Sequence, residues 1–133
     1  MKERSVRKSK VIKTRNAGTM SESAFWAFIR STLRQKSRWW KPITQCKQNA
    51  KRPYKGANKR QKFEYQCNKC KKWFPDKQIN VDHVKPVGTL TCAADLSTFV
   101  ENLFCEVDNL QCLCTGCHNS KTKIENSNRK ILK

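Results

Sequence analysis

Two Cys-x-x-Cys pairs restrict the folds open to this chain more than any other feature of its sequence. Cys67–Cys70 and Cys114–Cys117 are separated by residues 71–113. Each pair can place two thiolates on one side of a tight turn, and two such turns can complete a tetrahedral Zn²⁺ site. Disulfides or redox pairs are the alternative for eight cysteines. The charged N-terminus lacks the apolar segment and cleavage site of a secretory signal, so we expect a cytoplasmic protein, which favours metal over disulfides.

A zinc ion held by four cysteines would be structural, because no coordination position stays open for chemistry. Residues 63–133 are too few to bury a large core, so bound metal is expected to contribute much of their stability. Cys112 is the main rival for a ligand position, because it lies two residues before Cys114 and points to the same side of an extended strand. The cysteines outside the two pairs are interpreted as buried or free thiols: Cys46, Cys92, Cys105 and Cys112.

Positive charge is concentrated in the first half of the chain. The net charge is +19 over 133 residues, and in residues 63–133 the acidic residues nearly balance the basic ones. Residues 1–62 contain only two acidic residues, Glu3 and Glu22. This asymmetry is typical of proteins that bind a polyanion such as a nucleic acid. A solvated surface, or one that binds anionic lipid, is the alternative; no apolar run is long enough to span a membrane.

Composition divides the chain into three parts. Residues 1–18 are predicted to be a flexible basic arm that becomes ordered on a phosphate backbone, or simply a tail. Residues 19–62 are predicted to be a basic helical extension. Residues 63–133, which begin where the composition changes at Phe63, are predicted to form the zinc-containing domain.

Two helices are predicted in the extension. Thr19 and Glu22 match a capping box before a helix over about residues 21–38, and a second helix over residues 43–52 should end before Pro53. The first helix has an apolar stripe, more typical of a core than of base stacking, and a basic face that is a candidate nucleic-acid-binding surface. The stripe contains Phe25, Phe28, Ile29 and Leu33, the basic face contains Arg30, Arg34 and Arg38, and one of Trp39 and Trp40 could be exposed to nucleic acid.

Three polar groups stand between and beyond the cysteine pairs. Asp82 and His83 end a strand-like segment, INVDH, and Asn109 begins a second one, NLQCLC. His118 directly follows Cys117, close to the start of a helical segment. Because the zinc turns would hold the strands and the helix together, we expect Asp82, His83 and His118 to meet. An ordinary strand end, with Asp82 solvated or paired with a lysine, is the alternative.

These residues closely resemble the motif of the zinc-bearing HNH endonucleases, the ββα-metal nucleases. The match consists of Asp82-His83, Asn109 in a DNL turn, and Cys117-His118 followed by Lys121-Thr122, and it covers residues 63–126. The preceding basic helical segment is similar to those of small phage-type members. The resemblance implies an α+β fold and metal-dependent hydrolysis of DNA phosphodiester bonds, by nicking or double-strand cleavage, in the host cytoplasm for a phage-encoded protein.

The roles of the family's motif residues can be carried over one by one. His83 would be the general base, because a neutral imidazole near pH 7 can take a proton from water. Asp82 and His118 would hold one catalytic divalent ion, Mg²⁺ or Mn²⁺, and leave room for water and phosphate oxygens. Asn109 would brace the loop and orient His83. Lys121 would contact phosphate, although a surface lysine is equally consistent with its position.

Two departures from the family pattern accompany this interpretation. The first motif residue is Asp where the family name implies His, and residues 84–108 form a long insert, in which we expect a small helix around residues 94–104. A non-catalytic zinc ribbon that binds nucleic acid, or a ribosome-associated basic zinc protein, would also explain the charge and the cysteines. Neither alternative explains the positions of Asp82, His83, Asn109 and His118. The sequence predicts no particular oligomeric state.

Overall fold

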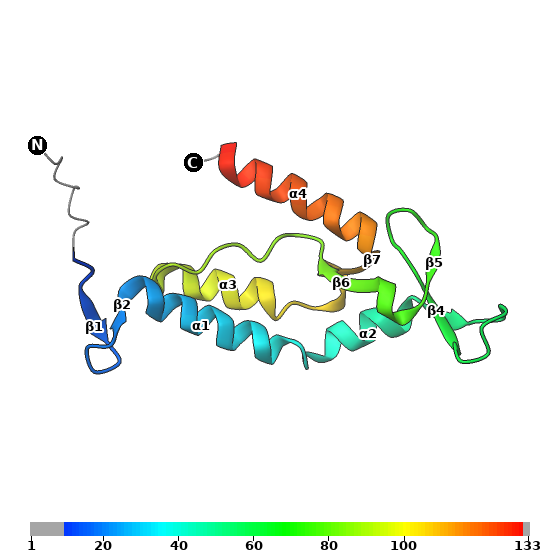
Figure 1. Ribbon diagram of the computed structural model, residues 1–133, viewed down its shortest axis with the longest axis horizontal. Helices are drawn as coiled ribbons and strands as arrows, with labels where there is room; N and C mark the ends of the chain where they lie inside the picture. Colours follow the sequence, from blue (N-terminus) through cyan, green and yellow to red (C-terminus); the bar gives the residue numbers. More distant parts are fainter. Residues whose placement is uncertain (1–9, 132–133) are drawn as a thin grey trace, which may run out of the picture.

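The structure, a computed structural model, describes residues 10–131 and has an α+β fold (Figure 1). The helices are α1 (Glu22–Ser37), α2 (Lys41–Asn49), α3 (Leu96–Leu103) and α4 (Thr115–Ile131). The strands are β1 (Lys13–Arg15), β2 (Met20–Ser21), β3 (Lys51–Pro53), β4 (Phe63–Gln66), β5 (Trp73–Phe74), β6 (Ile79–His83) and β7 (Leu110–Cys114). Single 3-10 turns are η1 (Asp76–Gln78), η2 (Ala93–Asp95) and η3 (Val107–Asn109).

The strands β6 and β7 pair antiparallel, and α4 follows β7 directly. The register sets Ile79 opposite Cys114 and His83 opposite Leu110. Because side chains alternate along a strand, Ile79 and His83 share one face of this pair and Asp82 lies on the other. The first face packs toward α2, and the second faces α4. The strand predicted over INVDH is confirmed, and the helix predicted near His118 begins at Thr115.

The basic extension and the cysteine-bearing half share one sheet and one core. The strand β3 pairs with β4, and β5 pairs with the other side of β4. Cys46 of α2 is buried in the same cluster as Cys112 of β7. The boundary expected at Phe63 therefore falls within a sheet. The second helix ends at Asn49, earlier than predicted, because residues 51–53 form the edge strand β3, the position in a sheet that tolerates a proline such as Pro53.

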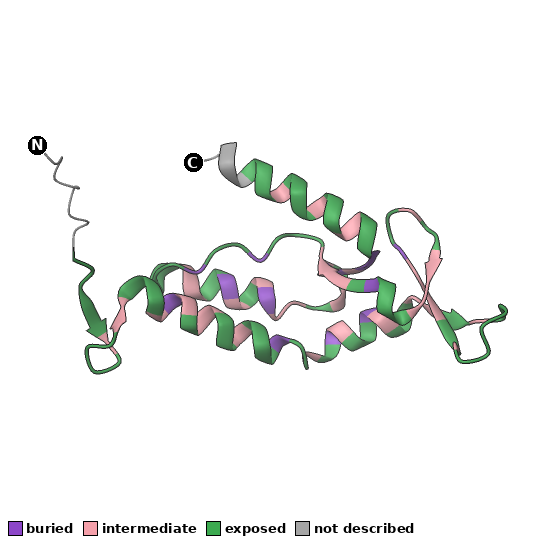
Figure 2. Cartoon of the chain, viewed as in Figure 1, coloured by how far each residue is buried: buried purple, intermediate pink, exposed green. Residues whose placement is uncertain are grey.

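The insert after β6 docks α1 onto the rest of the molecule. Trp26 of α1 is buried together with Val87 and Leu90 of the insert and with Phe99 and Leu103 of α3. Figure 2 shows buried residues on α1 and α3, which lie side by side. Burying an apolar side chain of this size contributes about 1.5–3 kcal/mol. The long insert, whose small helix is confirmed as η2 and α3, thus holds the basic helix α1 against α3.

The helix α1 lies where it was predicted but has a different N-cap and a different buried face. Ser21 Oγ accepts a hydrogen bond from the Ala24 N–H, so the capping box predicted at Thr19 and Glu22 is wrong. Phe28 is exposed, whereas Trp26 is buried and packs with the partly buried Phe25, Ile29 and Leu33. Phe28 lies about 200° around the helix from Trp26, so the insert covers the Trp26 side only. At the end of the helix Trp39 is exposed, and the Trp40 indole donates to the Cys105 carbonyl.

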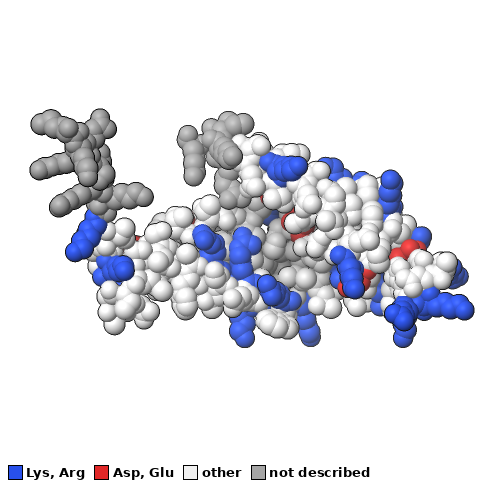
Figure 3. Space-filling view, viewed as in Figure 1, with Lys and Arg blue, Asp and Glu red and all other residues white. Residues whose placement is uncertain are grey.

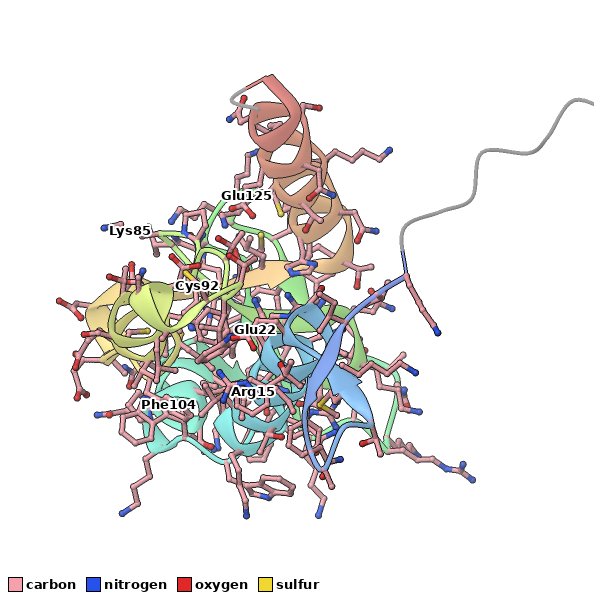
Figure 4. The ribbon with its side chains drawn as sticks, turned by 90° about the vertical axis from the view of Figure 1, so that its left-hand side faces the viewer. Arg15, Glu22, Lys85, Cys92, Phe104 and Glu125 are labelled. Atoms are coloured by element: carbon pink, nitrogen blue, oxygen red, sulfur yellow. The ribbon has the colours of Figure 1, made fainter. Side chains whose placement is uncertain are left out.

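A short hairpin precedes α1 where a flexible arm was predicted. The strands β1 and β2 pair antiparallel across a turn in which Asn16, Ala17 and Gly18 have positive φ. Arg15 donates two hydrogen bonds to Glu22, and Figure 4 shows the two residues near each other at this end of α1. The hydrogen bond with Arg15 lowers the pKa of Glu22 to about 2. This pair ties the hairpin to α1, and residues 1–9 of the predicted arm lie outside the described part of the chain.

Candidate metal centre and active site

The two Cys-x-x-Cys pairs meet as one four-cysteine cluster. Cys67 and Cys70 lie on the turn between β4 and β5, and Cys114 and Cys117 lie at the junction of β7 and α4. The four sulfur atoms lie within 4.8 Å of one another, and Cys70 Sγ is 4.0 Å from Cys114 Sγ. Four sulfur ligands about 2.3 Å from a zinc ion would be about 3.8 Å apart. The cluster therefore fits a metal ion such as zinc and leaves no position for a reacting molecule.

The thiol groups of this cluster affect one another's ionisation. Burial opposes ionisation of Cys67, but hydrogen bonds from the backbone of its own turn and of Cys114 outweigh burial and lower the pKa of Cys67 to about 6. The hydrogen bond with Cys114 raises the pKa of Cys117 to about 12. One thiolate therefore forms readily, and further negative charge is resisted until a cation neutralises the cluster.

Cys112, the rival ligand, lies outside the cluster. Its Sγ is 4.0 Å from Sγ of Cys46 on α2, and both thiols are buried. Because β7 ends at Cys114, it is Cys114 that reaches the junction with α4. Cys112 instead packs β7 against α2, and the hydrogen bond with Cys46 raises the pKa of Cys112 above its usual range. None of the eight cysteines, all within the described residues, forms a disulfide.

The carboxylate of Asp82 faces the first turns of α4. His118 Nε2 lies 3.8 Å from Asp82 Oδ1, and Lys121 Nζ lies 2.8 Å from Asp82 Oδ2. Lys121 also donates to the backbone carbonyl of His83 and to the carboxylate of Glu125, one helical turn later. Burial opposes the charge on Lys121, but its contacts with Asp82 and Glu125 outweigh burial and raise the pKa of Lys121. Lys121 therefore stays protonated and positively charged beside the carboxylates of Asp82 and Glu125.

The side chains of Asp82 and His118 lie close enough for both to contact one divalent cation. Two ligand atoms about 2.1 Å from one Mg²⁺ ion can be at most about 4.2 Å apart, and the Asp82 and His118 atoms are 3.8 Å apart. Asp82 Oδ2 is buried and forms an ion pair with Lys121. A carboxylate oxygen suits Mg²⁺ or Mn²⁺, whereas an imidazole nitrogen is more typical of transition-metal ions such as Zn²⁺ or Fe²⁺.

The imidazole of His83 is held by one hydrogen bond that determines its tautomer. His83 Nε2 lies 3.0 Å from the carbonyl oxygen of Leu103, at the end of α3. A carbonyl oxygen only accepts, so Nε2 of the neutral ring carries the proton and Nδ1 keeps a free lone pair. His83 can therefore accept a proton at Nδ1 while α3 fixes the orientation of the ring.

Asn109 fastens the segment that directly follows His83. Its Oδ1 accepts a hydrogen bond from the Lys85 N–H at 3.1 Å, and its backbone carbonyl accepts one from the Val84 N–H at 2.8 Å. Both bonds connect the end of β6 to the 3-10 turn before β7. This bonding is consistent with the bracing role expected of Asn109.

Asp82 and His83 line one cleft of about 440 Å³, together with residues of α4, of α1 and of the insert. In Figure 3 the surface is hollowed between α1 and α4, with acidic atoms on one wall and Lys and Arg atoms along the α1 side. The charged and imidazole side chains that line the cleft are Arg34, Asp82, His83, Lys121 and Glu125. A proton acceptor, a cation-binding carboxylate and two fixed positive charges suit hydrolysis of an anionic ester.

The predicted site residues divide into those inside this cleft and those outside it. Asp82, His83 and Lys121 line the cleft, and His118 contacts Asp82. Of the three predicted arginines only Arg34 lines it; Arg30 is half-buried and Arg38 is exposed elsewhere on α1. Glu125 was not predicted, and its i, i+4 spacing from Lys121 is the sequence signal that could have identified it.

Comparisons with protein-family models, with curated proteins and with solved structures find no match to this chain. Over residues 10–131, no helix has both the length and the apolar character needed to cross a membrane.

Proposed function

We propose that the chain is a metal-dependent endonuclease of the HNH type, which hydrolyses phosphodiester bonds of DNA and has a ββα-metal active site. The observation that carries the proposal is the arrangement at the end of β6: Asp82 contacts His118 and shares a cleft with His83, whose Nδ1 is free to accept a proton. The ion pair of Asp82 with Lys121 alone would also fit an ordinary strand end, but such a strand end does not explain the contact of the same carboxylate with His118 or the shared cleft with His83. The fit of the four-cysteine cluster to zinc supports the same assignment, with Zn²⁺ as a structural ion.

In the proposed reaction, His83 acts as the general base. Nδ1 of His83 removes a proton from a water molecule, whose oxygen attacks phosphorus. The bond from phosphorus to the 3′ oxygen breaks, and this oxygen takes a proton from solvent. The products are a 3′ hydroxyl and a 5′ phosphate. Leu103 and Asn109 hold the ring and the loop, and thus orient His83 through the reaction.

Asp82 and His118 are the residues that would hold the catalytic Mg²⁺ or Mn²⁺ ion. When bound, such an ion neutralises charge on the phosphate and on the leaving oxygen. The chain's own contribution is the carboxylate of Asp82, whose Oδ1 faces His118 while Oδ2 contacts the ammonium of Lys121. Lys121 itself lies where it can contact a phosphate that enters the cleft.

The direct test of this function is incubation of the purified protein with supercoiled plasmid and Mg²⁺ or Mn²⁺. We expect nicked and then linear DNA to appear, and chelation of the added ion to stop the reaction. Zinc content is measured in the same samples, so that loss of activity through loss of the structural ion is recognised. A protein that binds the plasmid but leaves it supercoiled at every metal concentration would instead be the non-catalytic zinc-binding alternative.

Affinity for DNA is expected to come mainly from the basic first half of the chain. Deletion of residues 1–62 cannot test this cleanly, because α2 and β3 belong to the shared core and sheet. We therefore expect replacement of exposed Arg38, Lys41 and Lys59 by Gln to reduce the slope of log affinity against log salt concentration by at least about 1, since each phosphate contact contributes about 0.9. Fluorescence anisotropy with a labelled duplex measures this slope.

The matched control replaces three exposed lysines of the second half: Lys69, Lys72 and Lys77. This variant loses the same charge, so an effect of net charge alone would appear equally in both. Equal salt slopes for the two variants would contradict a DNA-binding surface on the first half.

A further inference from the structure

We propose that Arg34 is a catalytic residue of this cleft, whose guanidinium binds the scissile phosphate and stabilises the negative charge that develops on it during cleavage. This inference rests on the proposed nuclease function and adds a residue to it. Arg34 belongs to α1, outside residues 63–126 that carry the sequence motif. Its role therefore follows from the position of α1 in the structure and not from the motif.

The helix α1 is fixed so that Arg34 enters the cleft that contains Asp82 and His83. The buried cluster formed by Trp26, the insert and α3 holds this helix in place. The guanidinium carbon of Arg34 lies 5.7 Å from the centre of the Phe99 ring, within the range of a cation–π contact. Phe99 belongs to α3, whose last residue, Leu103, accepts the hydrogen bond from His83. One short helix thus positions both the proton acceptor and the guanidinium.

The guanidinium of Arg34 is available for an anionic ligand. Within the described residues it forms no ion pair with a carboxylate, whereas Asp82 and Glu125 of the same cleft already contact Lys121. Arginine stays charged at all relevant pH values, and its planar fork of N–H donors matches two oxygens of a phosphate. Among the described residues that line the cleft, Arg34 is therefore the cation without a carboxylate partner, and it can bind a phosphate.

This placement gives Arg34 a role in the transition state as well as in binding. As water attacks phosphorus, negative charge grows on the non-bridging oxygens before the bond to the 3′ oxygen breaks. Two N–H donors of Arg34 can bind those oxygens without transfer of a proton, so the balance of the reaction is unchanged. Removal of one preorganised donor of this kind reduces the rate of a chemical step by about 10²–10³-fold.

The test compares Arg34→Ala with Lys72→Ala in single-turnover cleavage of a labelled duplex, with enzyme in excess. Both variants lose one positive charge, and Lys72 is exposed, does not line the cleft and lies in the half of the chain that is not assigned to DNA binding. We expect Arg34→Ala to lower the rate constant at saturating enzyme by about 10²-fold. Lys72→Ala should keep the wild-type rate constant. Arg34→Lys should recover part of the rate, since lysine restores charge but not the two-donor fork.

A second measurement separates a catalytic role from a structural one. Added guanidinium ion, at a concentration that does not denature the protein, should raise the rate of Arg34→Ala but not that of His83→Ala. Equal saturating rate constants for Arg34→Ala and Lys72→Ala would overturn this inference and leave the nuclease assignment intact. If the wild-type protein itself does not cleave DNA in Mg²⁺ or Mn²⁺, the proposed function fails first. Should Arg34→Ala melt at a lower temperature, Arg34→Gln, which keeps most of the side-chain stem beside Phe99, is compared in its place.

Discussion

Cys114→Ala is expected to abolish metal binding and to unfold the half of the chain that contains the candidate active site. Purified wild-type protein should contain one zinc ion per chain, and Cys114→Ala should contain none. Cys114 ends β7, and the helix that carries His118 and Lys121 starts at the next residue. Without metal, packing and a few hydrogen bonds, such as those from Asn68 to Gln111 and to the Cys112 carbonyl, connect this end of β7 to the turn that carries Cys67. Atomic absorption measures the zinc, and circular dichroism with thermal melting measures the loss of structure.

The expected effect is large because the metal adds to a small hydrophobic core in this part of the chain. Structural zinc sites in small peptides contribute about 10–16 kcal/mol of apparent binding free energy, whereas whole domains are stable by about 5–15 kcal/mol. Cys67 is completely buried in the hydrophobic core that also contains Cys46 and Cys112. Without metal, the four-cysteine cluster would therefore either bury thiolates or consist of protonated thiols without a metal ligand role. Chelation of the zinc should therefore unfold the wild-type protein in the same way.

Cys112→Ala is the matched control for this prediction. Cys112 and Cys114 are both buried on β7, two residues apart, but Cys112 contacts Cys46 rather than the cluster. Cys112→Ala should keep one zinc ion per chain and lose only the packing of one small side chain. Full zinc content and a wild-type melting curve in Cys114→Ala would refute the zinc site. Loss of zinc in Cys112→Ala would show that Cys112, the alternative ligand considered from the sequence, does bind the ion.

The local elements could be predicted well because the patterns that specify them involve residues close together in the sequence. Alternating apolar residues gave β6, the Cys-x-x-Cys spacing gave the four-cysteine cluster, and helical periodicity gave α1. The N-cap of α1 was predicted at Thr19 because Glu22 stands three residues later, as in a capping box. In the structure Arg15 binds Glu22 instead, so a contact with the preceding hairpin outweighs the local motif.

The arrangement of these elements depends on contacts that no local pattern contains. Val87 and Leu90 lie in an irregular segment without periodicity, yet they form a core with Trp26, about sixty positions earlier in the chain. The sequence could therefore not predict that the insert docks α1, or that Arg34 would share a cleft with Asp82. For the same reason, the change in composition at Phe63 indicates only where the positive charge ends, and it contains no information on the pairing of β3 with β4 across that position.

The two histidines of the chain are expected to fail differently when each is replaced by alanine. His83→Ala removes the proton acceptor but leaves Asp82 and His118 in place, so DNA binding and metal dependence should be unchanged. Cleavage should still fall by about 10²–10⁴-fold, the usual contribution of a general base. His118→Ala removes one of two protein ligands of the proposed catalytic ion. Its loss of activity should be recovered in part by a higher concentration of Mn²⁺.

Asp82→Asn should resemble His118→Ala. It tests the role of the Asp82 charge more specifically than Asp82→Ala does. Asparagine keeps the shape of the side chain but removes its negative charge, which Lys121 neutralises in the wild-type protein. Lys121 still has Glu125 and the His83 carbonyl as partners, so its position should be unchanged. Asp82→Ala would also leave a gap between β6 and α4, which mixes a packing defect with a metal defect. Equal zinc content and melting temperature in Asp82→Asn and wild type would establish that its defect is local.

The measurement is a titration of single-turnover cleavage rate against Mg²⁺ and against Mn²⁺ for wild type, His83→Ala, His118→Ala and Asp82→Asn. For His83→Ala the maximum should fall while the half-saturating metal concentration stays the same, because the ligands of the ion are intact. For His118→Ala and Asp82→Asn the half-saturating concentration should rise, because a two-ligand site that loses one ligand binds the ion more weakly. A wild-type maximum in His83→Ala would rule out His83 as the base. An unchanged half-saturating concentration in both other variants would mean that the catalytic ion, if there is one, is held elsewhere in the cleft.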